Sequence, residues 1–186
     1  MKKLATLAFF AVTLAAQAAT NWTLLGWNNL GMHCMDSDYE VFTILPPYNV
    51  IHAQLIRTVN GQAELVTNAT GLTVTYQAIA DQDGSITKTS EGKTDFWSYV
   101  LPLFGLSLAP DEGLPVPGPI YRMPGTNNTP QGMTYEPAPA WFAAYGIPIT
   151  PYDDADRKNP YPMMRLTARL NGNTVATTDI VLPVSD

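Results

Sequence analysis

The side chains best suited to bind a metal or to act as a nucleophile gather in one short segment, residues 27–39. This segment contains the chain's only cysteine, one of its two histidines, two methionines and two aspartates: His33, Cys34, Met32, Met35, Asp36 and Asp38. The second histidine, His52, follows on a stretch with the alternating pattern of a strand. Because thiolate, imidazole and thioether ligands favour copper or zinc, we predict a metal site formed by five residues: His33, Cys34, His52, Met35 and Asp36.

Two other interpretations of the same segment stay open. Adjacent residues of a strand point to opposite faces, so His33 and Cys34 could ligate one ion only from an irregular loop. Otherwise, a buried Cys34 and a hydrogen-bonded His33 would simply brace that loop. Alternatively, Cys34 could be a nucleophile, with one histidine as its base and Asn29 or a nearby aspartate to orient that base.

Two acidic turns are candidates for binding a hard cation. Asp81 and Asp83 belong to the sequence Asp-Gln-Asp-Gly, and Asp153 and Asp154 belong to Asp-Asp-Ala-Asp. Carboxylate oxygens suit Ca²⁺, so either pair is a candidate calcium site. Paired carboxylates could also act as the acid and base of a glycosidase, which depends on their separation in space. Residues 81–84 are equally typical of a simple hairpin turn.

The elements that must position these residues are mainly β-strands. Alternating polar and apolar residues, separated by turn sequences such as Asn171-Gly172, predict six of them: residues 22–27, 50–57, 72–78, 85–89, 164–170 and 174–182. Long amphipathic helices are missing from the pattern. We therefore predict a mostly-β, Ig-like β-sandwich, formed by residues 19–186 as a single domain.

The middle of the chain, residues 102–162, differs from this pattern. It contains thirteen of the sixteen prolines and many aromatic residues, so we predict a long ordered excursion laid over the sandwich. Short helices are expected at 95–104 and 139–145. Long ordered loops often carry function, so we expect a partner to be bound by residues from this excursion and from the segment around Cys34: Asn28, Asn29, Trp141, Tyr152, Asp153 and Asp154.

The N-terminus predicts export. Residues 1–18 combine Lys2 and Lys3, a short apolar stretch and Ala16-Gln17-Ala18, the pattern of a cleaved signal peptide. We expect a periplasmic or extracellular protein without a membrane anchor. Without the two lysines, eight basic residues stand against sixteen acidic ones, a formal charge of −8. Such a surface repels phosphate backbones, so nucleic acid is not an expected partner. No Cys-x-x-Cys-His motif occurs in the sequence, and no covalent haem is expected.

Four phrases carry a resemblance to a known family: WNNLGMHCMD at 27–36, ILPPYN at 44–49, GIPITPYDD at 146–154 and TDIVLPVSD at 178–186. The chain resembles an uncharacterised family of secreted bacterial proteins, over nearly all of its mature length. Longer members of that family continue, past the position of Asp186, into a segment with Cys-x-x-Cys-His haem attachment motifs, which this sequence does not contain. The resemblance implies a setting among periplasmic or surface electron-transfer proteins.

Two functions are therefore expected as alternatives. The first is a secreted, non-catalytic β-domain that binds a partner, a cytochrome-type redox protein, through its acidic surface and the proline-rich excursion. Acidic patches steer docking onto lysine-rich rims, an attraction that weakens with salt. The second is a metal-binding protein or metalloenzyme with copper or zinc at His33, Cys34 and His52. The sequence leaves open whether the protein is an enzyme.

Overall fold

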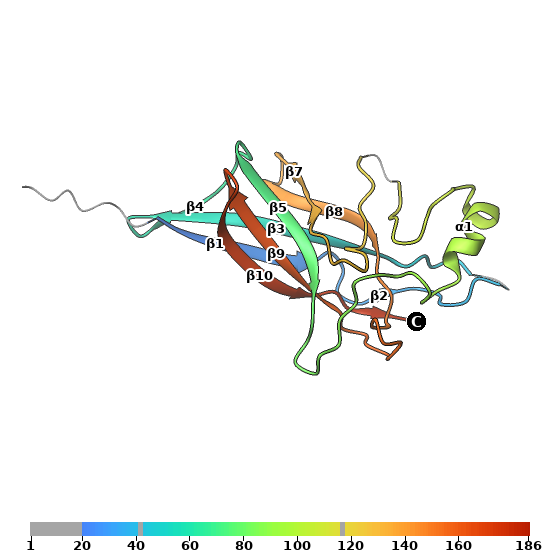
Figure 1. The fold of residues 1–186 in the computed structure, drawn as a ribbon. Helices are drawn as coiled ribbons and strands as arrows, with labels where there is room; N and C mark the ends of the chain where they lie inside the picture. Colours follow the sequence, from blue (N-terminus) through green and yellow to red (C-terminus); the bar gives the residue numbers. More distant parts are fainter. Residues whose placement is uncertain (1–19, 41–42, 116–117) are drawn as a thin grey trace, which may run out of the picture.

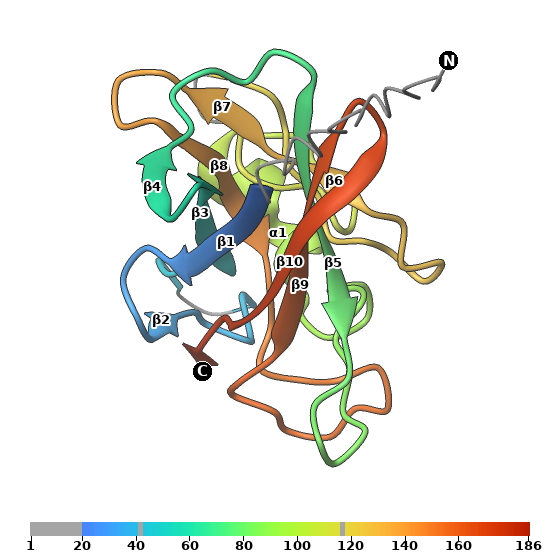
Figure 2. The same ribbon diagram turned by 90° about the vertical axis from the view of Figure 1, so that its left-hand side faces the viewer.

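The computed structural model describes residues 20–40, 43–115 and 118–186, which form two antiparallel β-sheets packed face to face (Figures 1 and 2). The first sheet has the order β1-β3-β8-β7, with β4 also paired to β3: β1 (Thr20–Asn28), β3 (Tyr48–Val59), β4 (Gln62–Leu65), β7 (Thr134–Glu136) and β8 (Trp141–Pro148). The second sheet has the order β10-β9-β5-β6: β5 (Leu72–Ile79), β6 (Gln131–Gly132), β9 (Met163–Leu170) and β10 (Asn173–Val181). The mostly-β sandwich is thus confirmed, while the predicted signal peptide, 1–18, lies outside the described residues.

The core lies between the two sheets and follows from the period of two along each strand. On β3, Ile51, Ala53 and Leu55 are fully buried, and on β5, Val74 and Tyr76 face them from the opposite sheet. Alternate residues of a strand point to opposite faces, so these positions share one face. Removing their apolar surface from water is the main force that holds the two sheets together.

The sandwich closes differently along its two sides. On one side β6 belongs to the second sheet and β7 to the first, so the chain crosses between the sheets at Met133. On the other side β1 packs over β9 and β10 at Gly26, where an added Cβ would lie 2.5 Å from Leu166 Cδ1 and 2.9 Å from Ile180 Cγ2. A residue without a side chain is therefore required for the sheets to approach each other at this edge.

Several predicted local elements are present. Strands cover the predicted ranges 22–27, 50–57, 72–78, 164–170 and, up to Val181, 174–182. Asn171 and Gly172 both have positive φ, 50° and 84°, as a tight hairpin turn between β9 and β10 requires. The predicted helix at 95–104 is α1 (Phe96–Phe104), which contains Pro102 and ends at Gly105 with φ 68°.

The predicted strand at 85–89 is wrong. These residues form no strand; instead, Ile86 and Lys88 hydrogen-bond with Asp154, and Thr87 donates to the carbonyl of Tyr152. Both edges of β5 are occupied, by β9 and by β6. β6 pairs with Thr75 and Tyr76, and nearer the turn the Asn128 side chain binds both the N–H and the carbonyl of Ala78, each at 2.9 Å. The edge that a returning strand would use is therefore occupied, and the segment follows the 150–158 loop instead.

The predicted helix at 139–145 is also wrong, because residues 139 and 140 lie in a turn and residues 141–145 begin β8. β8 pairs with β3 on one edge and β7 on the other, and its aromatic and aliphatic residues are buried on both faces. Gly146, with φ 68°, lies where the register with β3 shifts and forms a bulge instead of a helix end. The proline-rich segment 102–162 thus contributes β6, β7 and β8 to the sheets.

The last pair of strands and the helix lie at one end of the sandwich. β2 (His33–Cys34) and β11 (Val184–Ser185) form a short parallel pair, and α1 lies beyond the start of β3 (Figure 1). A second, smaller hydrophobic cluster forms there around Tyr39, Phe96 and Val100. No helix in the described part of the chain is long and apolar enough to span a membrane.

Candidate functional site

The cysteine and its neighbours lie on and after β2. His33 is opposite Val184 and Cys34 is opposite Ser185. The Cys34 thiol is exposed, and Ser185 Oγ donates a hydrogen bond to Cys34 Sγ over 3.7 Å. Met35, the next residue, is buried in the main core. Cys34 and Met35 therefore point to opposite sides of the chain, one to solvent and one to the interior.

Two other predicted metal ligands, His33 and Asp36, flank Cys34 and Met35 in the sequence. Asp36 Oδ2 accepts hydrogen bonds from the backbone N–H groups of Ile44 at 3.0 Å and Leu45 at 2.8 Å, which closes the 36–45 loop. Burial lowers the pKa of His33, and the backbone of Tyr48 opposes this in part. His33 Nε2 is buried without a hydrogen-bond partner among the described residues, an environment that disfavours the charged form of the ring.

His52 lies in the first sheet within a cluster of aromatic rings. Its imidazole is 3% exposed, and its centroid lies 4.2 Å from that of Trp141 and 5.7 Å from that of Trp27. Tyr145 meets it edge-on at 5.7 Å. Burial lowers the pKa of His52, and the Glu136 carboxylate opposes this in part. Burial in this aromatic cluster therefore disfavours the charged form of the imidazole.

The predicted copper or zinc centre receives no support from this arrangement. Among residues 20–40, 43–115 and 118–186, no group of three or more His, Cys, Asp or Glu side chains could hold a metal ion. His33 lies on the β2–β11 pair, whereas His52 lies inside the first sheet between β1 and β8. The physical reason is strand pairing, because β2 pairs with the last strand of the chain and not with β3.

The carboxylates of the acidic turns accept hydrogen bonds from backbone groups of their own loops. Asp81 Oδ1 accepts hydrogen bonds from two backbone N–H groups of its turn, each at 2.9 Å. Asp153 is 1% exposed. Burial alone would raise the pKa of Asp153, but the backbone N–H groups of Arg157 and Ala155 and the Arg157 guanidinium lower it to about 2. These carboxylates stabilise the loops, and neither pair belongs to a metal-binding group among the described residues.

The residues predicted to contact a partner are only partly accessible. Asn28 and the backbone of Gly31 close a turn, and the neighbouring Asn29 is exposed. Trp141 is half-buried, and its Nε1 donates to Glu136 Oε2 at 2.7 Å. Of these three predicted residues, only Asn29 presents its whole side chain to solvent.

The other three predicted partner residues, in the turn after β8, are held by internal contacts. The Tyr152 hydroxyl donates to Asp186 Oδ2 at 2.6 Å. Asp154 Oδ1 lies 2.7 Å from Lys93 Nζ, whose side chain is nearly buried. Asp153 is buried as described above. We therefore assign this turn a structural role and look elsewhere for a docking surface.

The charges are unevenly distributed over the surface. Seven of the eight lysines and arginines that the structure describes form ion pairs, and Arg169 is the exception. Those pairs occupy six side-chain carboxylates, which leaves ten of the sixteen without an ion-pair partner in the described ranges. The sequence has several long stretches without a lysine or arginine, and residues 37–56 and 94–121 are two of them.

These two base-free stretches meet at one end of the molecule, in the α1 lobe, defined as residues 36–40, 43–48 and 94–108. The backbone N–H of Tyr39 donates to Asp95 Oδ1 at 2.7 Å, which joins the two stretches. The pKa of Tyr99 is raised, first by desolvation and then by the carboxylates of Glu40, Asp95 and Asp38. The lobe therefore brings several unpaired carboxylates close together without a base between them.

The α1 lobe also exposes large apolar side chains. Ile44 is 65% exposed and Leu101 is 60% exposed, and three more are at least partly open to solvent: Leu45, Leu103 and Phe104. Single exposed apolar residues are ordinary, but a group of five on one small lobe is typical of an interaction surface. The sequence pattern did not identify these residues. No sequence signal singles out the lobe, because residues 58–87 and 123–156 lack lysine and arginine as well.

Comparison with known proteins gives this chain no relatives from which to carry over a function. No family model matches it, and neither does any curated protein. Function must therefore be inferred from the chemistry of its own surfaces.

Proposed function

We propose that this protein is a secreted, non-catalytic β-domain that docks through its α1 lobe onto a basic partner, a cytochrome-type redox protein with a lysine-rich rim. The observation that carries the proposal is the coincidence of unpaired carboxylates and exposed apolar side chains on the same lobe. The β-sandwich provides a rigid support, because α1 and the 36–45 loop are anchored to it through the small cluster around Phe96.

The charge of the lobe supports a cationic partner. Asp38 and Glu40 are exposed, and neither has an ion-pair partner in the described part of the chain. Lys93 is the base nearest to α1 in the sequence, and its ammonium group is already bound to Asp154. Complementary charge across an interface raises the association rate and disfavours wrong partners.

The apolar side chains of the lobe support a docking contact beyond electrostatic attraction. An interface needs side chains that lose water when the partner arrives, and these are typically apolar residues within a polar rim. Ile44 and Leu101 have most of their side-chain surface in water. In this proposal, they form the dry centre of the contact and the carboxylates form its rim.

The experiment measures binding of the mature domain to a lysine-rimmed c-type cytochrome by titration calorimetry. Affinity should fall steeply from about 0.01 M to about 1 M salt, as the Debye length falls from about 30 Å to about 3 Å. The double variant Asp38→Asn with Glu40→Gln should weaken binding about three- to tenfold. Replacing Ile44 and Leu101 by serine should weaken binding further, with the melting temperature nearly unchanged because both are exposed.

The matched control removes the same number of charges elsewhere. Asp83→Asn with Asp156→Asn neutralises two exposed carboxylates on turns outside the α1 lobe, and binding should stay within a factor of two of the wild type. The proposal fails if this control weakens binding as much as the lobe variant does. It also fails if an acidic cytochrome binds as tightly as the basic one.

A further inference from the structure

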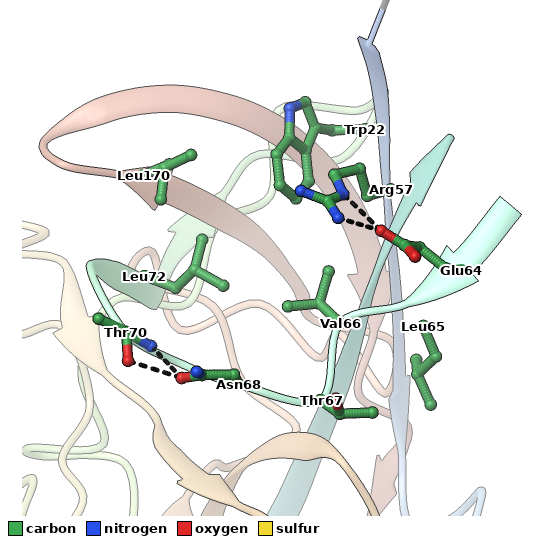
Figure 3. A pocket seen from close by; sticks show the side chains of 10 residues that line it. All are labelled: Trp22, Arg57, Glu64, Leu65, Val66, Thr67, Asn68, Thr70, Leu72 and Leu170. Atoms are coloured by element: carbon green, nitrogen blue, oxygen red, sulfur yellow. Dashed lines mark hydrogen bonds and ion pairs between the residues drawn. The ribbon is translucent and has the colours of Figure 1, made fainter. Parts of the chain in front are cut away.

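A pocket lies at the end of the sandwich opposite the α1 lobe, where β1 begins and β3 turns into β4 (Figures 1 and 3). Its volume is about 370 Å³, near the lower limit of about 300 Å³ for small-molecule sites. Three of its residues form one row across the first sheet, because Trp22 is the cross-strand partner of Arg57, which in turn is the partner of Glu64. The pocket is therefore the open end of the space between the two sheets.

The wall opposite this row is apolar. Leu72 of β5 and Leu170 of β9 are a cross-strand pair of the second sheet. Val66, which follows β4 and donates its N–H to Leu55 of β3, contributes a third aliphatic side chain from the side of the first sheet. Figure 3 shows these side chains and the Trp22 indole around one central space. Trp22 packs partly against the core and also lines the pocket. A ligand would thus meet an aromatic ring and aliphatic side chains.

The charged groups of the pocket cancel each other. Arg57 Nε donates to Glu64 Oε1 at 2.7 Å, and its terminal nitrogen contacts the same oxygen. Both side chains are about half exposed. They occupy positions on the inner side of the sheet, where the alternating pattern would place apolar residues. A neutralised pair with open donors and acceptors suits an uncharged polar ligand better than an ion.

Further polar groups lie across the pocket from the ion pair (Figure 3). Asn68 Oδ1 accepts hydrogen bonds from the backbone N–H and the hydroxyl of Thr70, each at 2.7 Å. The amide nitrogen of Asn68 donates no hydrogen bond to any other residue that the structure describes. Amide N–H donors at this position could reach a ligand from the side opposite Glu64.

We propose that this pocket binds a neutral sugar, as a single hexopyranose ring or the end of a short oligosaccharide. A pyranose ring has an apolar face of C–H groups, which fits the Trp22 indole, and an edge of hydroxyl groups, which fits the Arg57–Glu64 pair and Asn68. A purely apolar ligand would strip water from the ion pair without replacing its hydrogen bonds. A charged ligand would find no net opposite charge. The site is separate from the α1 lobe and does not depend on the proposed docking function.

The test is a titration of the mature protein with glucose, galactose, N-acetylglucosamine and cellobiose, followed by the indole N–H signals in proton–nitrogen correlation spectra. The sequence has four tryptophans, and the Trp22→Leu variant assigns the signal of residue 22. At least one of these sugars should shift that signal while the other three stay in place. The dissociation constant should be on the order of 1 mM, as the usual efficiency of small ligands gives for about twelve non-hydrogen atoms.

Two variants and one control test the assignment of roles. Trp22→Leu keeps an apolar side chain but removes the stacking face, and Glu64→Gln removes the charged acceptor; each should weaken binding about tenfold, measured by the chemical shifts of the sugar. Asp179→Asn breaks another partly exposed cross-strand pair, with Arg165 on the other sheet. This control should leave the affinity unchanged.

Three results would overturn the proposal. One is that none of the four sugars shifts the Trp22 signal. Another is that Glu64→Gln and Trp22→Leu, while still folded by circular dichroism, bind as well as the wild type. The third is that a neutral proline-rich peptide shifts the Trp22 signal and the sugars do not, which would make this a peptide site.

Discussion

At the scale of single residues, burial lowers the pKa of both histidines, although they lie in different parts of the fold. Both were predicted as metal ligands; His52 is instead buried in the first sheet, and His33 is half-buried with its Nε2 atom buried. Burial lowers the pKa of His33 and of His52, against smaller opposing contributions. Each ring therefore remains neutral in the folded protein under conditions in which an exposed histidine would gain a proton.

The difference in histidine pKa between the folded and the unfolded protein predicts how stability depends on pH. In the unfolded chain both histidines titrate near the ordinary pKa of about 6.5, whereas the folded protein binds these protons only at lower pH. As the pH falls below 6.5 the unfolded state binds more protons, so the free energy of unfolding decreases until the lowered folded pKa values are reached. We expect urea midpoints to fall between about pH 7 and about pH 5.

The measurement that checks this is a titration of the two imidazole signals in the folded protein, assigned with His33→Gln and His52→Gln. Both midpoints should lie below the value of a model peptide. Each variant should also lose part of the pH dependence of the urea midpoint. A midpoint at or above 6.5 for either ring would contradict the prediction for that residue.

At the scale of elements, the proline-rich loop after α1 is fixed to the sandwich by close backbone contacts. Gly113 N–H donates to the Tyr121 carbonyl at 2.8 Å, and Leu114 N–H donates to the Gly146 carbonyl of β8 at 3.1 Å. A Cβ at Gly113 would lie 2.3 Å from the Gly146 oxygen and 2.4 Å from the Tyr121 oxygen. Both neighbours are backbone atoms, so the clash can be relieved only by separating the loop from β8.

Gly113→Ala should therefore lower the free energy of unfolding by more than about 2 kcal/mol, in the range of forced overpacking in a tightly packed interior. Gly132→Ala is the matched control, because its Cβ would meet nothing within 4 Å and its φ is ordinary. That control should change stability by less than about 0.5 kcal/mol. Equal melting temperatures for the two variants would contradict the packing of this loop on β8.

At the scale of the whole molecule, the protein has two hydrophobic clusters of very different size. The main core joins the two sheets, while the α1 lobe depends on a small cluster around Tyr39, Phe96 and Val100. A small cluster contributes less free energy, so the lobe should open locally without unfolding of the sandwich. The proposed docking surface thus lies on the less stable part of the molecule, and the proposed sugar pocket lies at the opposite end, next to the main core.

Phe96→Ala tests this separation. Phe96 is 1% exposed and contacts the rings of Tyr39 and Tyr48, so its loss should remove the packing that holds α1. In hydrogen exchange, residues 36–40, 43–48 and 94–108 should exchange at least tenfold faster in the variant, while β5 and β9 keep their protection. Leu101→Ala, at an exposed position of the same helix, should change neither the exchange of the α1 lobe nor that of β5 and β9. Faster exchange throughout the sandwich would show that the two clusters unfold together.

The local features of this protein were determined by its sequence. The alternating residues of β1, β3, β5, β9 and β10, the Asn171-Gly172 turn and the end of α1 at Gly105 all depend on neighbours a few residues away. The acidic surface is a property of composition alone. Such features can be predicted because period, turn chemistry and charge act at short range.

The tertiary structure decided which edges and which side chains meet. The predicted strand at 85–89 is absent because β9 and β6 already pair with β5. Residues 141–148 form a strand because they pair with β3 on one edge and with β7 on the other. Pairing also separated His33 from His52, and it aligned Trp22, Arg57 and Glu64 in one row. These outcomes depend on register between segments far apart in the chain, which no local pattern encodes.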